Sequence, residues 1–241
     1  RASRTVPFVS KALGITLAKA ASLVMVGKTI NELISGGHLP AKDGTHIPAG
    51  QAISVKEAVL PFKRFATKDG RFVDSLLGTE MRSTGEVMGI DVDFPTAFAK
   101  SQSAAGSALP TSGSIFISVA DRDKPQVILP VRRLHQLGYR IMATSGTAAI
   151  LERHGITTTV VRKHSDENNR DEPSIVDLIS AGEVDVVVNT PSGSGLAARK
   201  DGYEIRAATT AADKAIFTTI AQLSAAIGSF ESVIAGPFKV K

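Results

Sequence analysis

The chain has 241 residues, enough for one large domain or two of ordinary size, and 43% of them are hydrophobic, as in a globular protein with a substantial core. Its net charge of +5 might point to nucleic acid, but the basic residues are scattered, only 5% of the residues are aromatic and there is no Trp, so this class is disfavoured. The absence of Cys excludes disulfides, thiolate zinc sites and thiol nucleophiles, and no apolar run is long enough to span a membrane.

The first part of the chain predicts mixed helix and strand. In order, we expect a helix at 17–26, a short helix after Thr29, a loop at 38–51, a strand at 53–60, a packed loop over 76–89 and a helix opened by Asp93 and Pro95. The Gly- and Ser-rich stretch 106–113 is the best linker, so we place a boundary there between units 1–106 and 107–241.

Glu57 stands among the apolar residues of the strand predicted at 53–60. A buried carboxylate without a partner is costly, so Glu57 is expected either to pair with a structural Arg or Lys or to face a cleft.

The second part predicts an α/β fold. Strands are expected at 114–119, 139–143, 157–161 and 184–188, and helices at 127–137, 147–154, 174–181, from about 204 after an Asp201-Gly202 turn, and at 218–227, with 230–241 as a short strand or tail. Strands that alternate with helices of these lengths predict a doubly wound parallel sheet.

Polar side chains follow each of these four strands. A phosphate can bind where a strand turns into a helix N-terminus, as at 144–147, although small residues also end strands and cap helices for structural reasons alone. Two ammonium groups, hydroxyls and an amide suit a phosphate monoester. The residues concerned are Lys124, Thr144, Thr147, Lys163, Asn189 and Thr190. The histidines are scattered and no catalytic triad or metal cluster is evident, so the residues alone predict a phosphate-ligand binding domain without chemistry of its own.

Several motifs resemble a known family. Arg1-Ala2-Ser3-Arg4-Thr5-Val6-Pro7, Ser54-Val55-Lys56-Glu57, Leu76-Leu77-Gly78 and Glu80-Met81-Arg82-Ser83-Thr84-Gly85-Glu86-Val87-Met88-Gly89 are similar to the end of the second ATP-grasp unit in carbamoyl phosphate synthase large subunits. The remainder, 107–241, resembles the C-terminal regulatory domain of that subunit, which has the methylglyoxal-synthase-like fold. Because the chain starts without Met, we expect it to be part of a longer subunit.

The resemblance implies a ligase that makes carbamoyl phosphate from bicarbonate, glutamine-derived ammonia and ATP for pyrimidine and arginine biosynthesis. It implies Mg²⁺ or Mn²⁺, K⁺ and ATP as cofactors, a small glutaminase subunit as partner, and a cytoplasmic location. Arg1 and Arg4 resemble the phosphate-side arginines of the family. The family's metal ligands precede Arg1, so these residues alone are expected to be inactive.

The resemblance also implies effector sites and self-association. A nucleoside monophosphate, UMP or IMP, would contact Ser118, Lys124, Thr144, Thr147, Lys163, Asn189 and Thr190. Ornithine would contact Glu57 and Thr218, and homo-oligomers would form through the regulatory domain. Pro191 replaces a Thr found in many relatives and removes a phosphate donor, and the loop 162–173 is longer than usual.

Two other functions stay open. A methylglyoxal-synthase-type lyase has the same fold, but its catalytic carboxylate would fall at 192–195, where this chain has none. A purely structural oligomerisation domain would bind neither UMP nor IMP.

Overall fold

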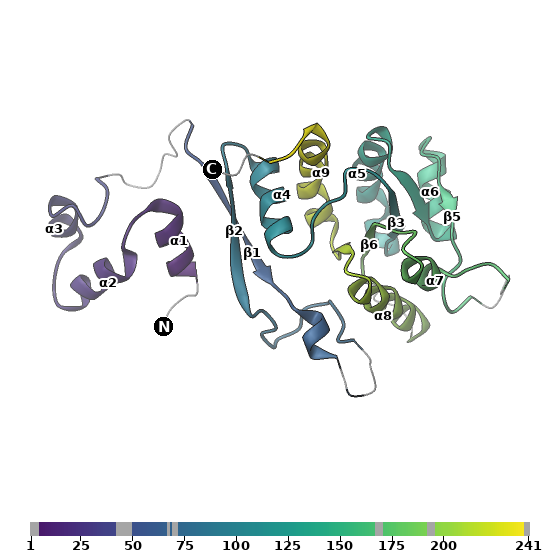
Figure 1. The fold of residues 1–241 in the computed structure, drawn as a ribbon, viewed down its shortest axis with the longest axis horizontal. Helices are drawn as coiled ribbons and strands as arrows, with labels where there is room; N and C mark the ends of the chain where they lie inside the picture. The colour runs from purple at the N-terminus through teal and green to yellow at the C-terminus, as the bar shows by residue number, and fades with distance from the viewer. Residues whose placement is uncertain are drawn as a thin grey trace.

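The computed structural model describes residues 5–41, 50–66, 68, 72–166, 171–191 and 196–238. Two sheets and the helices around them make up the described part of the chain (Figure 1). In chain order the elements are α1 (Thr5–Leu13), α2 (Leu17–Met25), α3 (Ile30–Ser35), β1 (Ile53–Val59), η1 (Phe62–Phe65), β2 (Gly85–Asp91), α4 (Phe94–Ala104), β3 (Ser114–Ser118), η2 (Asp121–Asp123), α5 (Lys124–Gln136), β4 (Arg140–Ala143), α6 (Ser145–Arg153), β5 (Thr159–Val160), α7 (Ile175–Ser180), β6 (Val186–Asn189), α8 (Leu196–Ala211), β7 (Ala215–Phe217) and α9 (Ile220–Ala235).

The second part forms a parallel sheet with helices on both faces. Its strand order is β5-β4-β3-β6-β7, and every pairing is parallel. Successive side chains of β3 point to opposite faces, so Ile115 and Ile117 pack with residues of α5, α6 and α9, whereas Phe116 packs with residues of α7 and α8. The prediction of a doubly wound α/β fold is therefore confirmed.

The first part forms a two-stranded antiparallel sheet that packs on α4. Strands β1 and β2 pair so that Glu57 lies opposite Val87 and Val55 lies opposite Gly89. Helix α4 in turn contacts α9, where Thr96 and Ser232 share a 2.8 Å hydroxyl–hydroxyl hydrogen bond. The division into two domains at 106–113 stays a prediction, because this packing joins elements from either side of it.

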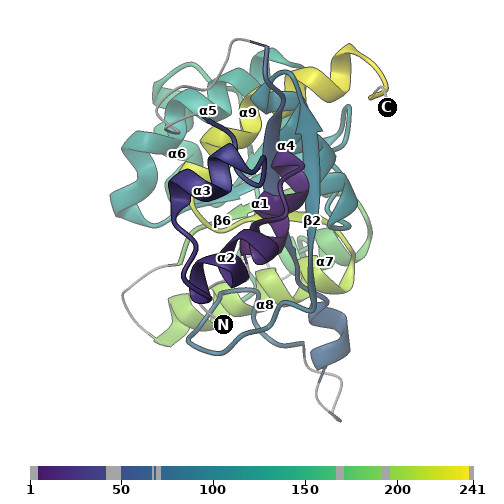
Figure 2. The same cartoon turned by 90° about the vertical axis from the view of Figure 1, so that its left-hand side faces the viewer.

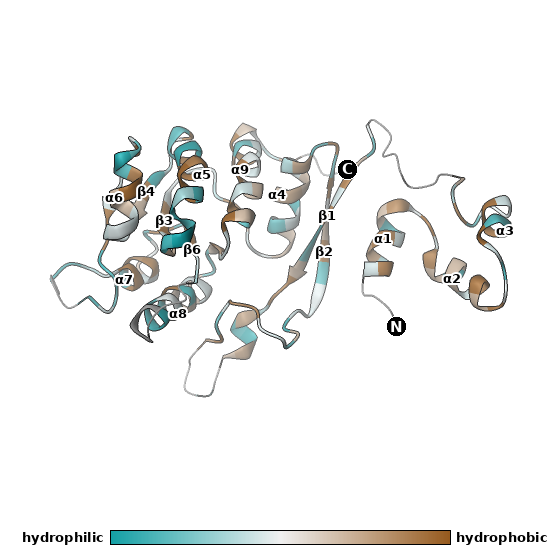
Figure 3. Cartoon of the chain, turned by 180° about the vertical axis from the view of Figure 1, so that it is seen from behind, coloured by the Kyte–Doolittle hydropathy of each residue, from teal (hydrophilic) through white to brown (hydrophobic). Residues whose placement is uncertain are grey.

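Helices α1, α2 and α3 lie on the other side of the β1–β2 sheet from α4, as Figures 1 and 2 both show. Apolar side chains remain uncovered there: Met25 is 87% exposed and Val26 is 78% exposed. Figure 3 shows hydrophobic segments along these helices. Within the described residues no single helix is long and apolar enough to cross a membrane, and the α1–α2 pair meets the length and composition criteria only when its two bent helices are joined.

The expected packed loop over 76–89 is wrong from Gly85 onward, because Gly85–Asp91 forms β2. Alternation is hidden in the sequence because a glycine occupies an inward position. A Cβ at Gly89 would lie 1.9 Å from the carbonyl oxygen of Ala97 on α4, so a larger residue cannot stand there.

Three further elements differ from the expectations. Strand β7 was not predicted, because its three residues are too few to show an alternation of apolar and polar side chains. Asp201 and Gly202 lie inside α8 instead of in a turn, and α9 continues to Ala235, so Phe230 belongs to a buried helix and not to a strand or tail. A Cβ at Gly202 would come within 2.7 Å of the Arg206 Nη1 atom, so a larger residue in this part of the helix would displace that side chain.

Candidate functional site

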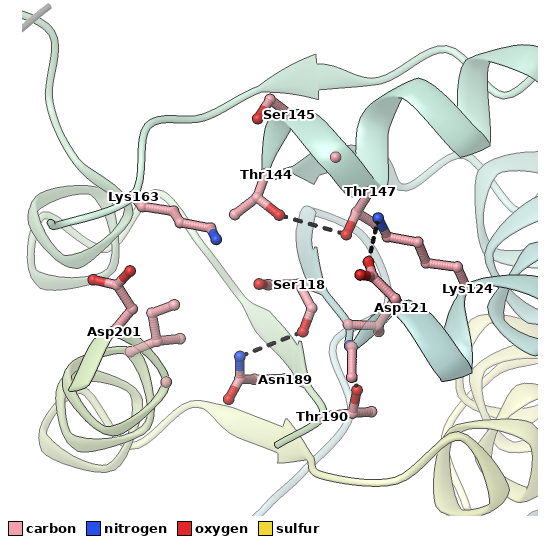
Figure 4. Close-up of a pocket in the computed structure, with 15 residues that line it drawn as sticks. Ser118, Asp121, Lys124, Thr144, Ser145, Thr147, Lys163, Asn189, Thr190 and Asp201 are labelled. Atoms are coloured by element: carbon pink, nitrogen blue, oxygen red, sulfur yellow. Dashed lines mark hydrogen bonds and ion pairs between the residues drawn. The ribbon is translucent and has the colours of Figure 1, made fainter. Parts of the chain in front are cut away.

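A cavity of about 330 Å³ lies at the carboxyl ends of β3, β4 and β6 (Figure 4). All the residues predicted for the nucleotide site line it: Ser118, Lys124, Thr144, Thr147, Lys163, Asn189 and Thr190. Its lining also includes residues outside that set, namely Asp121, Ser145, Gly146, Asp201 and Gly202. Residues at the carboxyl ends of parallel strands thus meet in one cavity although they are up to 72 positions apart in the sequence, from Ser118 to Thr190.

One wall is the start of α6. Thr144 is the N-cap residue, and its carbonyl accepts from the backbone N–H groups of Thr147 and Ala148, both at 2.8 Å. The first N–H groups of a helix have no partner within the helix, and here they belong to Ser145 and Gly146 at the cavity. The Thr144 hydroxyl donates to the Thr147 hydroxyl at 3.4 Å, and both side chains are buried. This wall offers neutral donors beside the positive end of a helix dipole.

Lys124, the first residue of α5, lies beside that wall. Its ammonium is 2.8 Å from the Asp121 carboxylate and 3.3 Å from the position of a Cβ at Gly146. The hydrogen bond and charge of Lys124, with a smaller contribution from Lys163, hold the pKa of Asp121 below its usual value. The Lys124 side chain is only 21% exposed, whereas that of Asp121 is 93% exposed. The lysine is therefore largely enclosed, whereas its carboxylate partner lines the cavity where it opens to solvent.

The amide of Asn189 lies at the end of β6 with both of its polar atoms engaged. Its Nδ2 atom donates to the Ser118 carbonyl at 3.3 Å, and its Oδ1 atom accepts from Arg206 Nη1 at 2.6 Å. Thr190 follows, and its hydroxyl accepts from the Ala120 N–H at 2.9 Å, which joins the turns after β3 and β6.

Two charged residues at this site are absent from the sequence-based set. Asp201 is 6% exposed and accepts from the backbone N–H of Ser165 at 3.1 Å and from its hydroxyl at 2.6 Å. Figure 4 shows it on the same side of the cavity as the backbone of Lys163, whose ammonium points into the cavity. Arg206 is 3% exposed. Asp201 was missed because the Asp201-Gly202 pair resembles a turn. Arg206 was missed because no local pattern distinguishes it from a surface arginine. A helix predicted over the whole of 196–211 would have placed Asp201 and Arg206 on the same element.

Glu57 and Thr218, predicted for ornithine, lie away from this cavity, and the described contacts do not join them. Glu57 is half-buried and accepts from the Gln102 amide at 2.9 Å, so its described partner is neutral and not the Arg or Lys expected of a structural pair. Burial raises the pKa of Glu57, against the opposing effect of hydrogen bonds from the Ala58 backbone and Gln102. Thr218 directly follows β7.

Two further points concern the ATP-grasp arginines and metal binding. Arg1 and Arg4 lie outside the described residues. Among the residues that are described, no group of three or more His, Asp or Glu side chains is placed to hold a metal ion.

The site and fold have counterparts in known proteins. Residues 126–218 match the MGS-like domain family. The chain is 68% identical over 237 residues to the carbamoyl phosphate synthase large chain of Clavibacter michiganensis subsp. michiganensis, a match that covers 98% of this chain and 21% of that protein. It is 61% identical over 241 residues to the large chain of Beutenbergia cavernae, covering 100% of this chain and 22% of that one. The large chain of Kocuria rhizophila is 56% identical over 228 residues, with 94% and 20% covered.

The chain thus spans about a fifth of the length of the curated relatives it matches. The match extends across the motifs at 54–57 and 80–89 as well as the MGS-like region, so the resemblance seen in the sequence is confirmed. The chain belongs to the carbamoyl phosphate synthase large chain family and carries an MGS-like domain.

Proposed function

We propose that this chain is the C-terminal regulatory part of the large subunit of a glutamine-hydrolysing carbamoyl phosphate synthase. Its cavity binds a nucleoside monophosphate, UMP or IMP, which tunes ATP-dependent carbamoyl phosphate synthesis for pyrimidine and arginine biosynthesis. One observation carries the proposal: the seven residues predicted for the nucleotide, from four strand ends, line a single cavity.

The chemistry of the cavity supports a phosphate ester. Two lysines supply charge, Thr144 and Thr147 supply hydroxyls, and the start of α6 supplies N–H groups. A volume of about 330 Å³ lies at the small end of ligand pockets, which suits a mononucleotide better than a dinucleotide.

Pro191 limits what the turn after β6 can donate. It has no N–H, and its carbonyl accepts from Arg122 Nη2 at 2.9 Å. A phosphate at this turn therefore depends on Asn189 and Thr190, and we expect a weaker contact here than in relatives with a second Thr.

Ornithine is proposed as the ligand of Glu57, with Thr218 as a further contact. The support is the half-buried carboxylate whose described partner is a neutral amide, because an ammonium ligand would supply the missing positive charge.

The remaining proposals concern the longer subunit. There we expect ATP, Mg²⁺ or Mn²⁺, and K⁺ to act in synthesis, with Arg1 and Arg4 on the phosphate side of the ATP-grasp site. A small glutaminase subunit is the expected partner, self-association runs through the MGS-like domain, and the location is cytoplasmic. Residues 1–241 alone should not form carbamoyl phosphate from ATP, and turnover by this chain would refute that.

Calorimetric titration of the chain with UMP, IMP and ornithine tests the effector sites. Lys163→Ala removes a charge-assisted contact and should weaken the nucleotide by about 1.5–3 kcal/mol. Lys19→Ala, on exposed α2 far from the cavity in Figure 1, removes the same charge and should leave the affinity unchanged. Equal affinities for the two variants would remove Lys163 from the site.

The same preparation separates the two other functions. A purely structural oligomerisation domain would give no heat with either nucleotide. A methylglyoxal-synthase-type lyase would release phosphate from dihydroxyacetone phosphate. We expect heat and no phosphate release, since the segment 192–195 has no carboxylate.

A further inference from the structure

We propose that Asp74 is a positioning residue of the cavity, acting through Arg206 on the amide of Asn189. This rests on the proposed function, because it concerns how the same cavity recognises an anion. Asp74 lies outside the segment 126–218 that matches the MGS-like family, so the binding site would depend on the part of the chain that precedes that domain.

Arg206 links the carboxylate of Asp74 to the side-chain amide of Asn189. Its Nε and Nη2 atoms donate to Asp74 Oδ1 and Oδ2, both at 2.6 Å, in the bidentate geometry that fixes a guanidinium plane. Its Nη1 atom donates to Asn189 Oδ1 at 2.6 Å. The Arg206 side chain is 4% exposed, so it has little access to water as a substitute partner.

The hydrogen bond from Arg206 determines which way the Asn189 amide group is oriented. An amide has an acceptor end and a donor end, and Arg206 takes the acceptor end. The Nδ2 group is thereby held toward the Ser118 carbonyl, at a rather long 3.3 Å, and toward the cavity that both residues line. An amide turned the other way would present an oxygen to an anionic ligand and repel it.

Helix α8 approaches the Arg206 guanidinium closely at Gly202. A Cβ at Gly202 would lie 2.7 Å from Nη1 and 3.6 Å from Asn189 Oδ1, so any larger residue there would displace the guanidinium. If Asp74 lost its charge, Arg206 would be left buried without a counter-ion and would reorient toward another acceptor. Asn189 would then lose its fixed orientation.

Other contacts besides those of Asp74 also join this part of the chain to α8 and the residues after it. Tyr203 donates from its hydroxyl to the Phe72 carbonyl at 2.7 Å, and Lys63 forms an ion pair with Asp213 just after α8. Lys63→Met therefore provides a matched control, because it breaks an ion pair between the same two parts of the chain without touching Arg206.

The test is a double-mutant cycle on the 241-residue chain, with whichever of UMP and IMP binds the wild type as the probe. Asp74→Asn should raise Kd about tenfold, and Lys63→Met should change it by less than about twofold. In an Asn189→Ala background, Asp74→Asn should have less than about a twofold further effect, because the residue through which it acts is gone. Asp74→Glu, which keeps the charge, should retain part of the affinity, and it replaces Asp74→Asn if that variant does not fold.

Unchanged or tighter binding by Asp74→Asn would overturn the inference, and so would an equal loss in the presence and absence of the Asn189 side chain. If the wild type binds neither nucleotide nor inorganic phosphate, the proposed function fails, and the positioning role is then decided by NMR. The side-chain amide signals of Asn189, identified by their loss in Asn189→Ala, should shift in Asp74→Asn and not in Lys63→Met. Signals that stay in place would refute the role independently of any ligand.

Discussion

Substitution of Gly89 by Ala should destabilise the packing of β2 on α4. The added Cβ would lie 1.9 Å from the Ala97 carbonyl oxygen and 2.6 Å from the Ser101 backbone nitrogen, whereas non-bonded heavy atoms are comfortable at about 3.5 Å. Both neighbours are backbone atoms of α4, so no side-chain rotation relieves the contact. The helix and the strand would have to separate by about 1.5 Å, and a gap of that size forfeits more than half of the dispersion energy of the atoms that line it.

We expect a loss of about 3 kcal/mol in the free energy of unfolding, at the upper end of the range for overpacked cores, because Ala97, Phe98 and Ser101 are all buried at this contact. Urea unfolding followed by circular dichroism should show a midpoint lower by about 1 M. Gly85→Ala is the control, since it lies on the same strand and its Cβ would meet nothing within 4 Å. Both changes restrict the unfolded chain equally, so equal midpoints for the two variants would refute the steric argument.

Three further predictions concern single buried groups. The raised pKa of Glu57 means that the folded state holds its proton more tightly than the unfolded chain, so its contribution to stability is present below the ordinary glutamate value of 4.5 and is lost as pH rises through the folded pKa. The urea midpoint of Glu57→Gln should therefore rise relative to that of the wild type as pH increases above 4.5. Burial raises the pKa of Tyr139 to about 12, and ultraviolet titration of Tyr203→Phe, which leaves Tyr139 as the only tyrosine, should show that midpoint, whereas an ordinary phenol midpoint would contradict it. Ser75 has a buried hydroxyl without a hydrogen-bond partner among the described residues, so Ser75→Ala should leave the free energy of unfolding unchanged or raise it. Ser101→Ala loses the 2.8 Å hydrogen bond from the Ser101 hydroxyl to the Phe98 carbonyl and should lower the free energy of unfolding by about 1 kcal/mol in the same assay.

The sheet could be predicted from the sequence because its central strands are buried on both faces. β3 and β6 are continuous apolar runs that end in polar residues, and the helices between them show regular apolar spacing. The elements that were missed lack those signals. β2 carries Gly89 at an inward position and β7 has three residues; of α8 only the part before about 204 was missed, where an Asp-Gly pair resembles a turn.

The site was predictable to the extent that topology fixes it. In a parallel sheet the residues just after each strand share one edge, so Lys124, Thr144 and Asn189 could be placed together without knowledge of any contact. Partners outside that rule could not be found. Asp74 reaches the site through Arg206 from an irregular segment, and no spacing in the sequence relates an irregular segment to a helix 132 positions away.

The cavity is less positive than the two predicted lysines alone suggest, because carboxylates also line it. Two lysines at strand ends suggest a strongly positive pocket, yet Lys124 is paired with Asp121, and the Asp201 carboxylate also lines the cavity. These carboxylates are not equivalent. Asp201 is buried and held by two hydrogen bonds from Ser165, so it would stay in place and repel a phosphate. Asp121 is almost fully exposed, and an exposed ion pair is weak, so a phosphate could replace it as the partner of Lys124. We therefore expect the anionic end of the proposed nucleotide beside Lys124, Lys163 and the start of α6, and its sugar or base, which carries hydrogen-bond donors, beside Asp201.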